Sequence, residues 1–106
     1  MNQNKINGLI GFAIRSRSIS FKQTLVKDVN HKKVNLIIYA SDVSENTLNE
    51  YKNEINSVKS IKYLTKNELG YLFNKENVGI FGIKNPNIAK EIIRIYNEEE
   101  VQDEEK

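Results

Sequence analysis

The chain has 106 residues and no cysteine, which excludes disulfide frameworks, thiolate zinc sites, iron–sulfur clusters and cysteine nucleophiles. Apolar residues make up 39% of the chain and charged residues 28%, which is typical of one globular domain and not of a disordered chain. No apolar run approaches the roughly 18 residues of a membrane span, and no apolar segment typical of a signal peptide follows the start. We therefore expect a cytoplasmic domain with no membrane partner.

The formal charge of +2 is the sum of two unlike parts. Residues 98–106 hold six acids and one lysine, so this acidic tail carries −5, whereas the domain over residues 1–97 carries +7. The first 27 residues contain five cations and no acid. A basic body of this kind suits an anionic partner such as nucleic acid. The alternative is an ordinary solvated basic face.

Apolar residues recur at helical spacing in five segments, with short β-rich runs between them. The expected elements are, in chain order, a helix over residues 4–15, a short extended link or strand at 18–19, a helix over 21–30, a strand over 34–40, a helix over 45–56, a strand over 61–64, a helix over 65–73, a strand over 78–83 and a last helix that begins at Pro86. The nearly continuous apolar run over 34–40 predicts a central strand covered on both faces. Strands that alternate with helices predict a three-layer α/β/α sandwich around a largely parallel sheet of four strands.

Several local signals refine this prediction. Ser20 with Gln23, and Thr65 with Glu68, have the spacing of capping boxes at helix starts. The two glycines of the first helix, at positions 8 and 11, either weaken it or let another element pack closely. Glycines in the last strand predict the close approach of a neighbour. The acidic tail is expected to extend the last helix or to fray from it.

The sequence offers little for catalysis. Asp42 follows the central strand, where α/β folds place ligands, but a lone aspartate there more often caps the next helix. His31 lies at a helix end, where an imidazole can satisfy backbone carbonyls. The pair Gly8 and Gly11 is no dinucleotide fingerprint, because no strand precedes it and the third glycine is missing. We therefore predict a non-enzymatic protein with no catalytic residue, no metal ligand and no cofactor.

The segment from Arg15 to Lys27 is the better candidate for function. It places cations at the end of one helix, in a link and at the start of the next helix. Backbone N–H groups and the dipole at that helix start can hold a phosphate, and Lys22 and Lys27 can reach phosphates on either side. The Gln23 amide can both donate to and accept from a base edge. The alternative interpretations are the capping box for Gln23 and ordinary helix-end cations for the lysines.

Several stretches of the chain make it similar to a known family. They are GFAIRSR at residues 11–17, VKDV at 26–29, LIIYASDVSENT at 36–47, TKNELG at 65–70 and NKE at 74–76. In this order and spacing, over about residues 6–97, the chain resembles the small bacterial YlxQ-type proteins. These belong to the kink-turn-binding ribosomal protein superfamily, which includes the archaeal ribosomal protein L-seven-Ae class.

The resemblance implies an α/β/α sandwich whose sheet is mixed, and a monomeric, non-catalytic protein that binds RNA kink-turns in ribosomal or other structured RNA. In these motifs, sheared G·A pairs beside a bulge present guanine edges, and the bent shape is read as well as the sequence. The family contacts are the start of the second helix and the loop before the last strand. Together with the nearby arginines, the expected RNA-binding residues are Arg15, Arg17, Phe21, Lys22, Gln23, Thr24, Lys27, Asn74, Lys75, Glu76, Asn77 and Val78.

The contact surface departs from the family signature, which is glycine, one variable residue, Asn-Glu, two more residues and lysine. Counted back from Lys27, Phe21 stands at the glycine, Gln23 at the asparagine and Thr24 at the glutamate. Phe21 either fills the core or stacks on an unstacked base. Asn74 replaces a glycine in the loop, and asparagine tolerates a left-handed backbone better than most residues. The alternative function is a protein-interaction module on the same fold that has lost kink-turn recognition.

Overall fold

The computed structural model describes residues 3–105, and it describes side chains over residues 3–98. The elements are α1 (Gln3–Arg15), β1 (Ile19–Ser20), α2 (Lys22–Asn30), β2 (Leu36–Tyr39), α3 (Glu45–Glu50), α4 (Lys52–Ser57), β3 (Ser60–Lys62), α5 (Lys66–Leu72), β4 (Ile80–Ile83) and α6 (Pro86–Glu105). Every predicted element is present, although the helix expected over residues 45–56 is divided into α3 and α4 at Tyr51. No helix in residues 3–105 is long and apolar enough to cross a membrane.

The four strands form one mixed sheet in the order β1-β4-β2-β3. β2 pairs with β3 in parallel, whereas β4 is antiparallel to both β1 and β2. The largely parallel sheet expected from the alternation of elements is therefore wrong, and the mixed sheet is confirmed. α5 joins β3 to β4, and β4 begins at the end of the sheet where β3 finishes. The chain consequently re-enters the sheet from that end and runs in the opposite direction.

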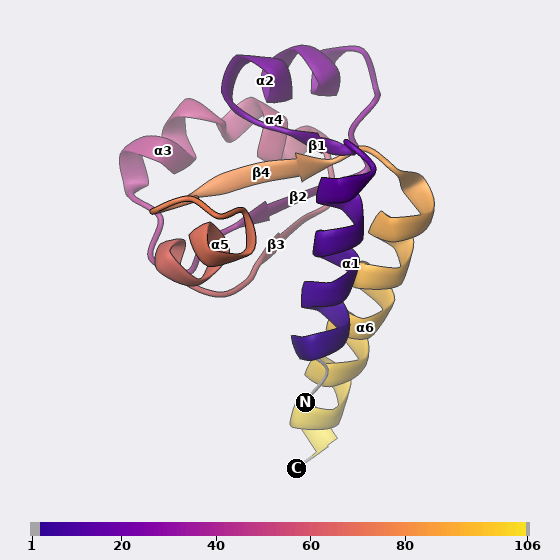
Figure 1. Cartoon of the computed structure of the whole chain (residues 1–106). Coiled ribbons are helices and arrows are strands. Elements are labelled where there is room, and N and C mark those ends of the chain that lie inside the picture. The colour runs from indigo at the N-terminus through magenta and orange to yellow at the C-terminus, as the bar shows by residue number, and fades with distance from the viewer. Residues whose placement is uncertain (1–2, 106) are drawn as a thin grey trace.

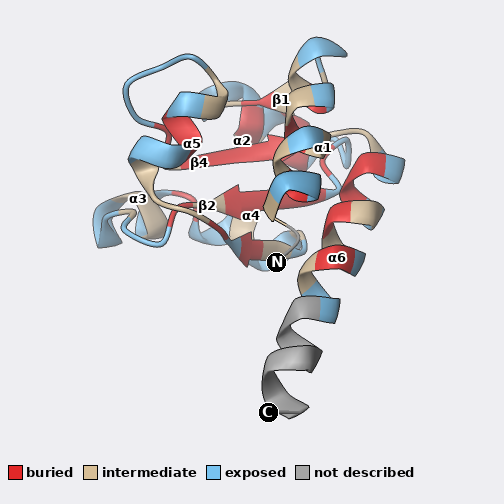
Figure 2. Cartoon of the chain, turned by 60° about the horizontal axis from the view of Figure 1, so that its bottom comes forward, coloured by how far each residue is buried: buried red, intermediate tan, exposed pale blue. Residues whose placement is uncertain are grey.

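Helices cover both faces of this sheet, so the three-layer α/β/α sandwich is confirmed (Figure 1). α1, α5 and α6 cover one face, and α2 and α4 cover the other. β2 contributes Leu36 and Ile38 to the first apolar cluster and Ile37 to the second, which explains why its sequence is apolar throughout. The buried residues follow the strands and the inner faces of the helices (Figure 2). α1 begins and α6 ends on the same side of the molecule (Figure 1).

One of the two predicted capping boxes is confirmed. The Thr65 hydroxyl accepts a hydrogen bond from the Glu68 N–H at 3.2 Å, and the Glu68 carboxylate accepts one from the Thr65 N–H at 3.0 Å. The box predicted for Ser20 and Gln23 is wrong, because α2 begins later and its N-cap residue has no side-chain cap. Ser20 is instead buried in β1 and donates to the Asp28 carboxylate at 2.5 Å, which ties β1 to α2.

Glycines serve different purposes in β4 and α1. A Cβ at Gly82 would lie 2.6 Å from a methyl carbon of Leu25, so this glycine allows the close packing of α2 on β4 that the sequence predicts. A Cβ at Gly8 would meet nothing within 4 Å, and no other element packs against this position. Gly8 therefore only weakens the helix.

The Gly8→Ala variant is expected to be more stable than the natural chain by about 0.5–1 kcal/mol, because alanine is the better helix former and restricts the unfolded chain. Thermal unfolding followed by circular dichroism should show a rise in Tm of several degrees. Gly82→Ala, which crowds Leu25, is the matched control and should lower the Tm. An unchanged or lower Tm for Gly8→Ala would contradict the open space at this position.

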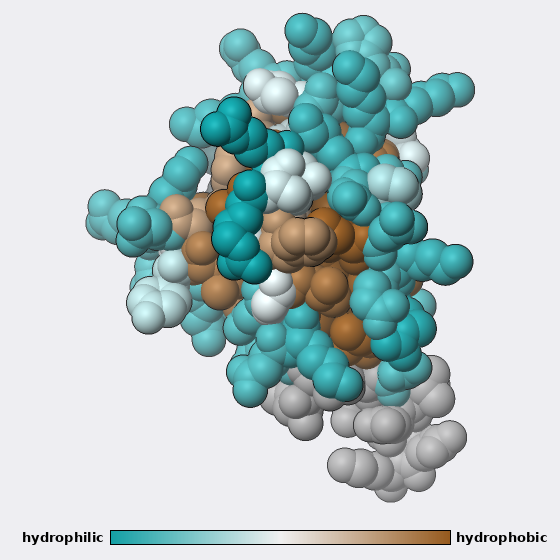
Figure 3. Space-filling view, turned by 45° about the vertical axis from the view of Figure 1, so that its right-hand side comes forward, coloured by the Kyte–Doolittle hydropathy of each residue, from teal (hydrophilic) through white to brown (hydrophobic). Residues whose placement is uncertain are grey.

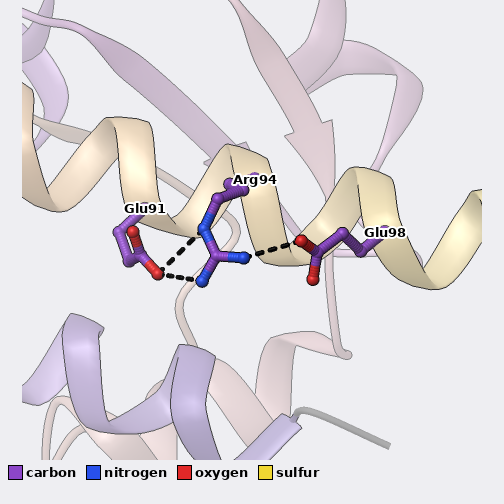
Figure 4. Close-up of polar contacts among 3 residues, drawn as sticks. All are labelled: Glu91, Arg94 and Glu98. Carbon is purple, nitrogen blue, oxygen red and sulfur yellow. Dashed lines mark hydrogen bonds and ion pairs between the residues drawn. The ribbon is translucent and has the colours of Figure 1, made fainter.

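α6 begins at Pro86, as predicted, and its backbone continues through Glu105, so the described part of the acidic tail extends the helix. On its exposed side, the Arg94 guanidinium donates to Glu98 at 2.6 Å and to Glu91 at 3.1 Å (Figure 4). The bond from Arg94 lowers the pKa of the Glu91 carboxyl. These exposed contacts contribute little to stability, but they fix the side chains along one side of α6.

Candidate nucleic-acid interface

A cleft of about 910 Å³ opens at one end of the sheet, where β2 ends and β4 begins. Four segments form its walls: the start of α2, the chain that follows β2, the start of α5 and the loop before β4. Figure 1 shows these segments gathered at the left of the molecule, and neither α1 nor α6 lines the cleft. The predicted RNA-binding residues that line it are Phe21, Lys22, Gln23, Thr24, Lys75, Asn77 and Val78.

Five predicted residues do not line the cleft. Lys27 is exposed one turn further along α2, and Asn74 and Glu76 are exposed in the loop that carries Lys75. Arg15 ends α1, and Arg17 follows it with a left-handed backbone at φ 60°. The neighbouring Ser18 carbonyl accepts a hydrogen bond from the Lys84 N–H, past the far end of β4. The structure therefore separates the two arginines from the cleft.

The start of α2 is open to an anion. Its N-cap residue, Phe21, is extended at φ −125° and ψ 151°, and no side chain caps the helix. The first turn contains no acid, and Lys22, Gln23 and Thr24 are all exposed. Backbone N–H groups at a helix start have no partner within the helix, and the helix dipole favours a negative charge beside them. The absence of a cap and of acids therefore favours an anion at this end of α2.

Phe21 joins the core to the cleft. Its ring lies 5.0 Å from the Phe73 ring and 6.2 Å from the Phe81 ring, measured between centroids, and it is half-buried. The predicted core-filling role is therefore present. On the cleft side, the Lys75 ammonium lies 4.3 Å from the centre of the Phe21 ring, within the range of a cation–π contact. The aromatic ring thus forms part of the cleft wall and is covered by a cation.

The loop before β4 is held by its backbone. A Cβ at Gly70 would lie 2.7 Å from the carbonyl oxygens of both Lys75 and Glu76, so only glycine allows the loop to approach α5 this closely. The Gly70 carbonyl accepts a hydrogen bond from the Lys75 N–H at 2.8 Å. Asn74 has a left-handed backbone at φ 58°, as predicted for the residue that replaces a glycine. This turn fixes the loop that carries Lys75 into the cleft.

The wall that follows β2 contains residues that the predicted site does not include. They are Val43, Ser44, Thr47, Glu50 and Tyr51. Lys66, at the start of α5, is a further cleft residue that the predicted site does not include. The sequence signal for this wall is the end of the buried strand, where α/β folds place ligands, but the ionisable group that it points to there is Asp42. Asp42 accepts a hydrogen bond from the Lys66 N–H at 2.8 Å, so it caps α5. The expectation that it caps the next helix is wrong, because Ser44 caps α3.

The charges of the cleft favour an anionic ligand. Three lysines, Lys22, Lys66 and Lys75, line it against one acid, Glu50. Burial, followed by the charges of Glu50 and Glu54, raises the pKa of the Tyr51 phenol, whose hydroxyl is a hydrogen-bond donor. Among the described residues, no group of three or more His, Cys, Asp or Glu side chains could hold a metal ion.

No family model matches the chain, and no curated protein matches it. The fold is similar to that of a solved protein of unknown function from Bacillus halodurans, with a TM-score of 0.78 and 22% sequence identity. The two structures correspond over 88% of this chain and 97% of the other. At this identity the similarity confirms the α/β fold and does not extend to function.

Proposed function

We propose that this chain is a non-catalytic, monomeric RNA-binding protein that recognises kink-turn motifs in ribosomal or other structured RNA of the cytoplasm. The resemblance to the YlxQ-type proteins motivates this proposal, and the cleft is the observation that carries it. The cleft combines an uncapped helix start with three lysines, and two of these, Lys22 and Lys75, belong to the surface that the resemblance assigns to RNA. Contacts to phosphates position a nucleic acid, whereas contacts to base edges provide specificity.

The residues of the cleft divide into those that contact phosphates and those that contact base edges. Lys22, Lys66 and Lys75 neutralise phosphates, and the N–H groups of the first turn of α2 hold one phosphate directly. Gln23 contacts the guanine edges of the sheared pairs through its amide, in place of the family asparagine. The wall after β2, with Thr47 and the Tyr51 hydroxyl, supplies further hydrogen-bond partners for the bent backbone.

Titration calorimetry against a short kink-turn RNA tests this function. The control RNA keeps the bulge but replaces the G·A pairs with Watson–Crick pairs. We expect tight binding to the kink-turn and much weaker binding to the control. Equal, weak and salt-sensitive binding to both RNAs would show that only the basic charge acts, and the proposal would then be wrong.

The Lys22→Ala variant is expected to reduce the salt dependence of binding. Loss of one phosphate contact lowers the slope of log K against log salt by about 0.7–0.9. Fluorescence anisotropy with a labelled kink-turn at four or five salt concentrations measures this slope. Arg15→Ala removes a cation outside the cleft and should leave the slope unchanged, and Lys27→Ala reports whether the interface continues along α2. A slope that Lys22→Ala does not change would remove Lys22 from the interface.

A second candidate function is the protein-interaction module, which an apolar band on the opposite part of the molecule favours. On the face that contains α1 and α6, apolar side chains reach the surface between hydrophilic ones (Figure 3). Phe12 of α1 is a large apolar side chain that is 52% exposed. The second function is favoured by two results together. The protein purified at low salt would have the ratio of absorbance at 260 and 280 nm of a protein free of nucleic acid, and calorimetry would detect no RNA binding.

A further inference from the structure

The contact between Phe21 and Lys75 has no part in the RNA-binding role described so far. Both line the cleft, and the Lys75 ammonium sits 4.3 Å from the centre of the Phe21 ring. Phe73 and Phe81 hold the ring on the side of the core. Lys75 therefore covers a face of a ring that lines the cleft. An aromatic ring held in this way resembles the platforms on which proteins stack unpaired bases.

The two contacts compete for the same surface. Stacking of a base on an aromatic side chain strengthens binding by about 5- to 150-fold. An exposed cation–π contact is weaker, equivalent to about two- to fivefold. Lys75 is exposed and unbranched, so it can leave the ring without disturbing the loop backbone, which Gly70 and Asn74 fix. The exchange of Lys75 for a base is therefore favourable.

We propose that Phe21 is a stacking subsite for one unpaired nucleobase of a bound RNA, and that Lys75 covers it until the RNA arrives. When the base stacks on Phe21, the Lys75 ammonium moves from the ring to a phosphate beside that base. One residue thus shields the ring from water in the free protein and neutralises charge in the complex. The subsite deepens the RNA-binding function proposed above, and it gives Phe21 a role that the family glycine cannot perform.

Removal of the base from the RNA tests the subsite. We measure the Kd of the protein for a kink-turn RNA and for the same RNA in which one unpaired nucleotide of the bulge has lost its base. For the natural chain, the abasic RNA is expected to bind about 5- to 150-fold more weakly. For Phe21→Leu, which keeps apolar contact with Phe73 and Phe81 but has no flat ring, the two RNAs should bind equally. Circular dichroism and thermal unfolding confirm that this variant folds.

The covering role of Lys75 has a separate readout. Lys75→Ala removes the competing cation, so the ratio of the Kd for the abasic RNA to that for the intact RNA should increase by about two- to fivefold. The slope of log K against log salt should fall by the amount expected for one phosphate contact. Lys66→Ala is the matched control, since it removes another cleft lysine that is not in contact with Phe21. It should reduce the salt slope and leave the contribution of the base unchanged. An equal base contribution in the natural chain and in Lys75→Ala would overturn the exchange.

The same measurements on the Watson–Crick control RNA, with and without the bulged base, separate this inference from the proposed function. One outcome is that the protein binds the kink-turn and the control RNA equally, but binds each more weakly when the base is absent, and that Phe21→Leu abolishes this difference. Kink-turn recognition is then wrong and the subsite stands. If the kink-turn is preferred and the base makes no difference in any variant, the subsite is wrong and the function stands.

Discussion

Replacement of Phe81 by alanine is expected to lower the free energy of unfolding by about 3–5 kcal/mol. Phe81 lies in β4, is completely buried and packs its ring 4.8 Å from that of Phe73. Such a loss is a large part of the roughly 5–15 kcal/mol by which a domain is stable. Urea unfolding followed by circular dichroism measures it directly.

Phe81→Leu provides the control, because it keeps most of the apolar volume and should cost clearly less than alanine. Phe81 also supports Phe21, whose ring lies 6.2 Å away. We therefore expect the alanine variant to lose RNA affinity even under conditions in which it remains folded. A loss of less than about 1 kcal/mol in Phe81→Ala would contradict the close packing of this cluster.

Replacement of Gly70 by alanine is expected to destabilise the protein by about 1–3 kcal/mol and to displace the loop before β4. The new Cβ would lie 2.7 Å from two carbonyl oxygens, and these belong to the backbone, which cannot rotate away as a side chain can. The loop must shift, and Lys75, Asn77 and Val78 shift with it. Affinity for a kink-turn RNA should fall by about tenfold, which corresponds to about 1.4 kcal/mol.

Gly11→Ala separates this effect from that of a glycine replacement in general, since a Cβ at Gly11 meets only the end of the Arg15 side chain at 3.4 Å. It should leave RNA affinity unchanged. Binding of Gly70→Ala as tight as that of the natural chain would show that the loop makes no contact with the RNA.

Local features of the fold were predictable because they depend on neighbouring residues. The apolar run over residues 34–40 predicted a strand covered on both faces, and Thr65 with Glu68 predicted a capped helix start. The sheet order was not predictable from spacing, because it depends on pairing between β4 and strands far away in the sequence. The box at Ser20 failed for a similar reason, since its hydroxyl bonds to the buried Asp28 and not to the helix start.

In the candidate site, too, the residues within short motifs were predictable and those brought in by the fold were not. Phe21 to Thr24 and the loop around Lys75 were identified from short motifs, and the structure brings them together. Arg15 and Arg17 adjoin that motif in the sequence, but β1 runs between them and Phe21 along the sheet and carries them away from the cleft. Lys66 and Tyr51 reach the cleft only through the fold, so no local pattern indicated them.

The placement of the chain ends affects how this domain can be joined to others. α1 begins and α6 ends on one side of the molecule (Figure 1), and neither helix lines the cleft. A fusion partner, a surface anchor or a second copy attached at either end therefore leaves the cleft accessible. Two copies joined end to end by a flexible linker would each keep an accessible cleft. After the first motif of an RNA binds, the second motif would bind at a raised effective concentration, which increases the overall affinity.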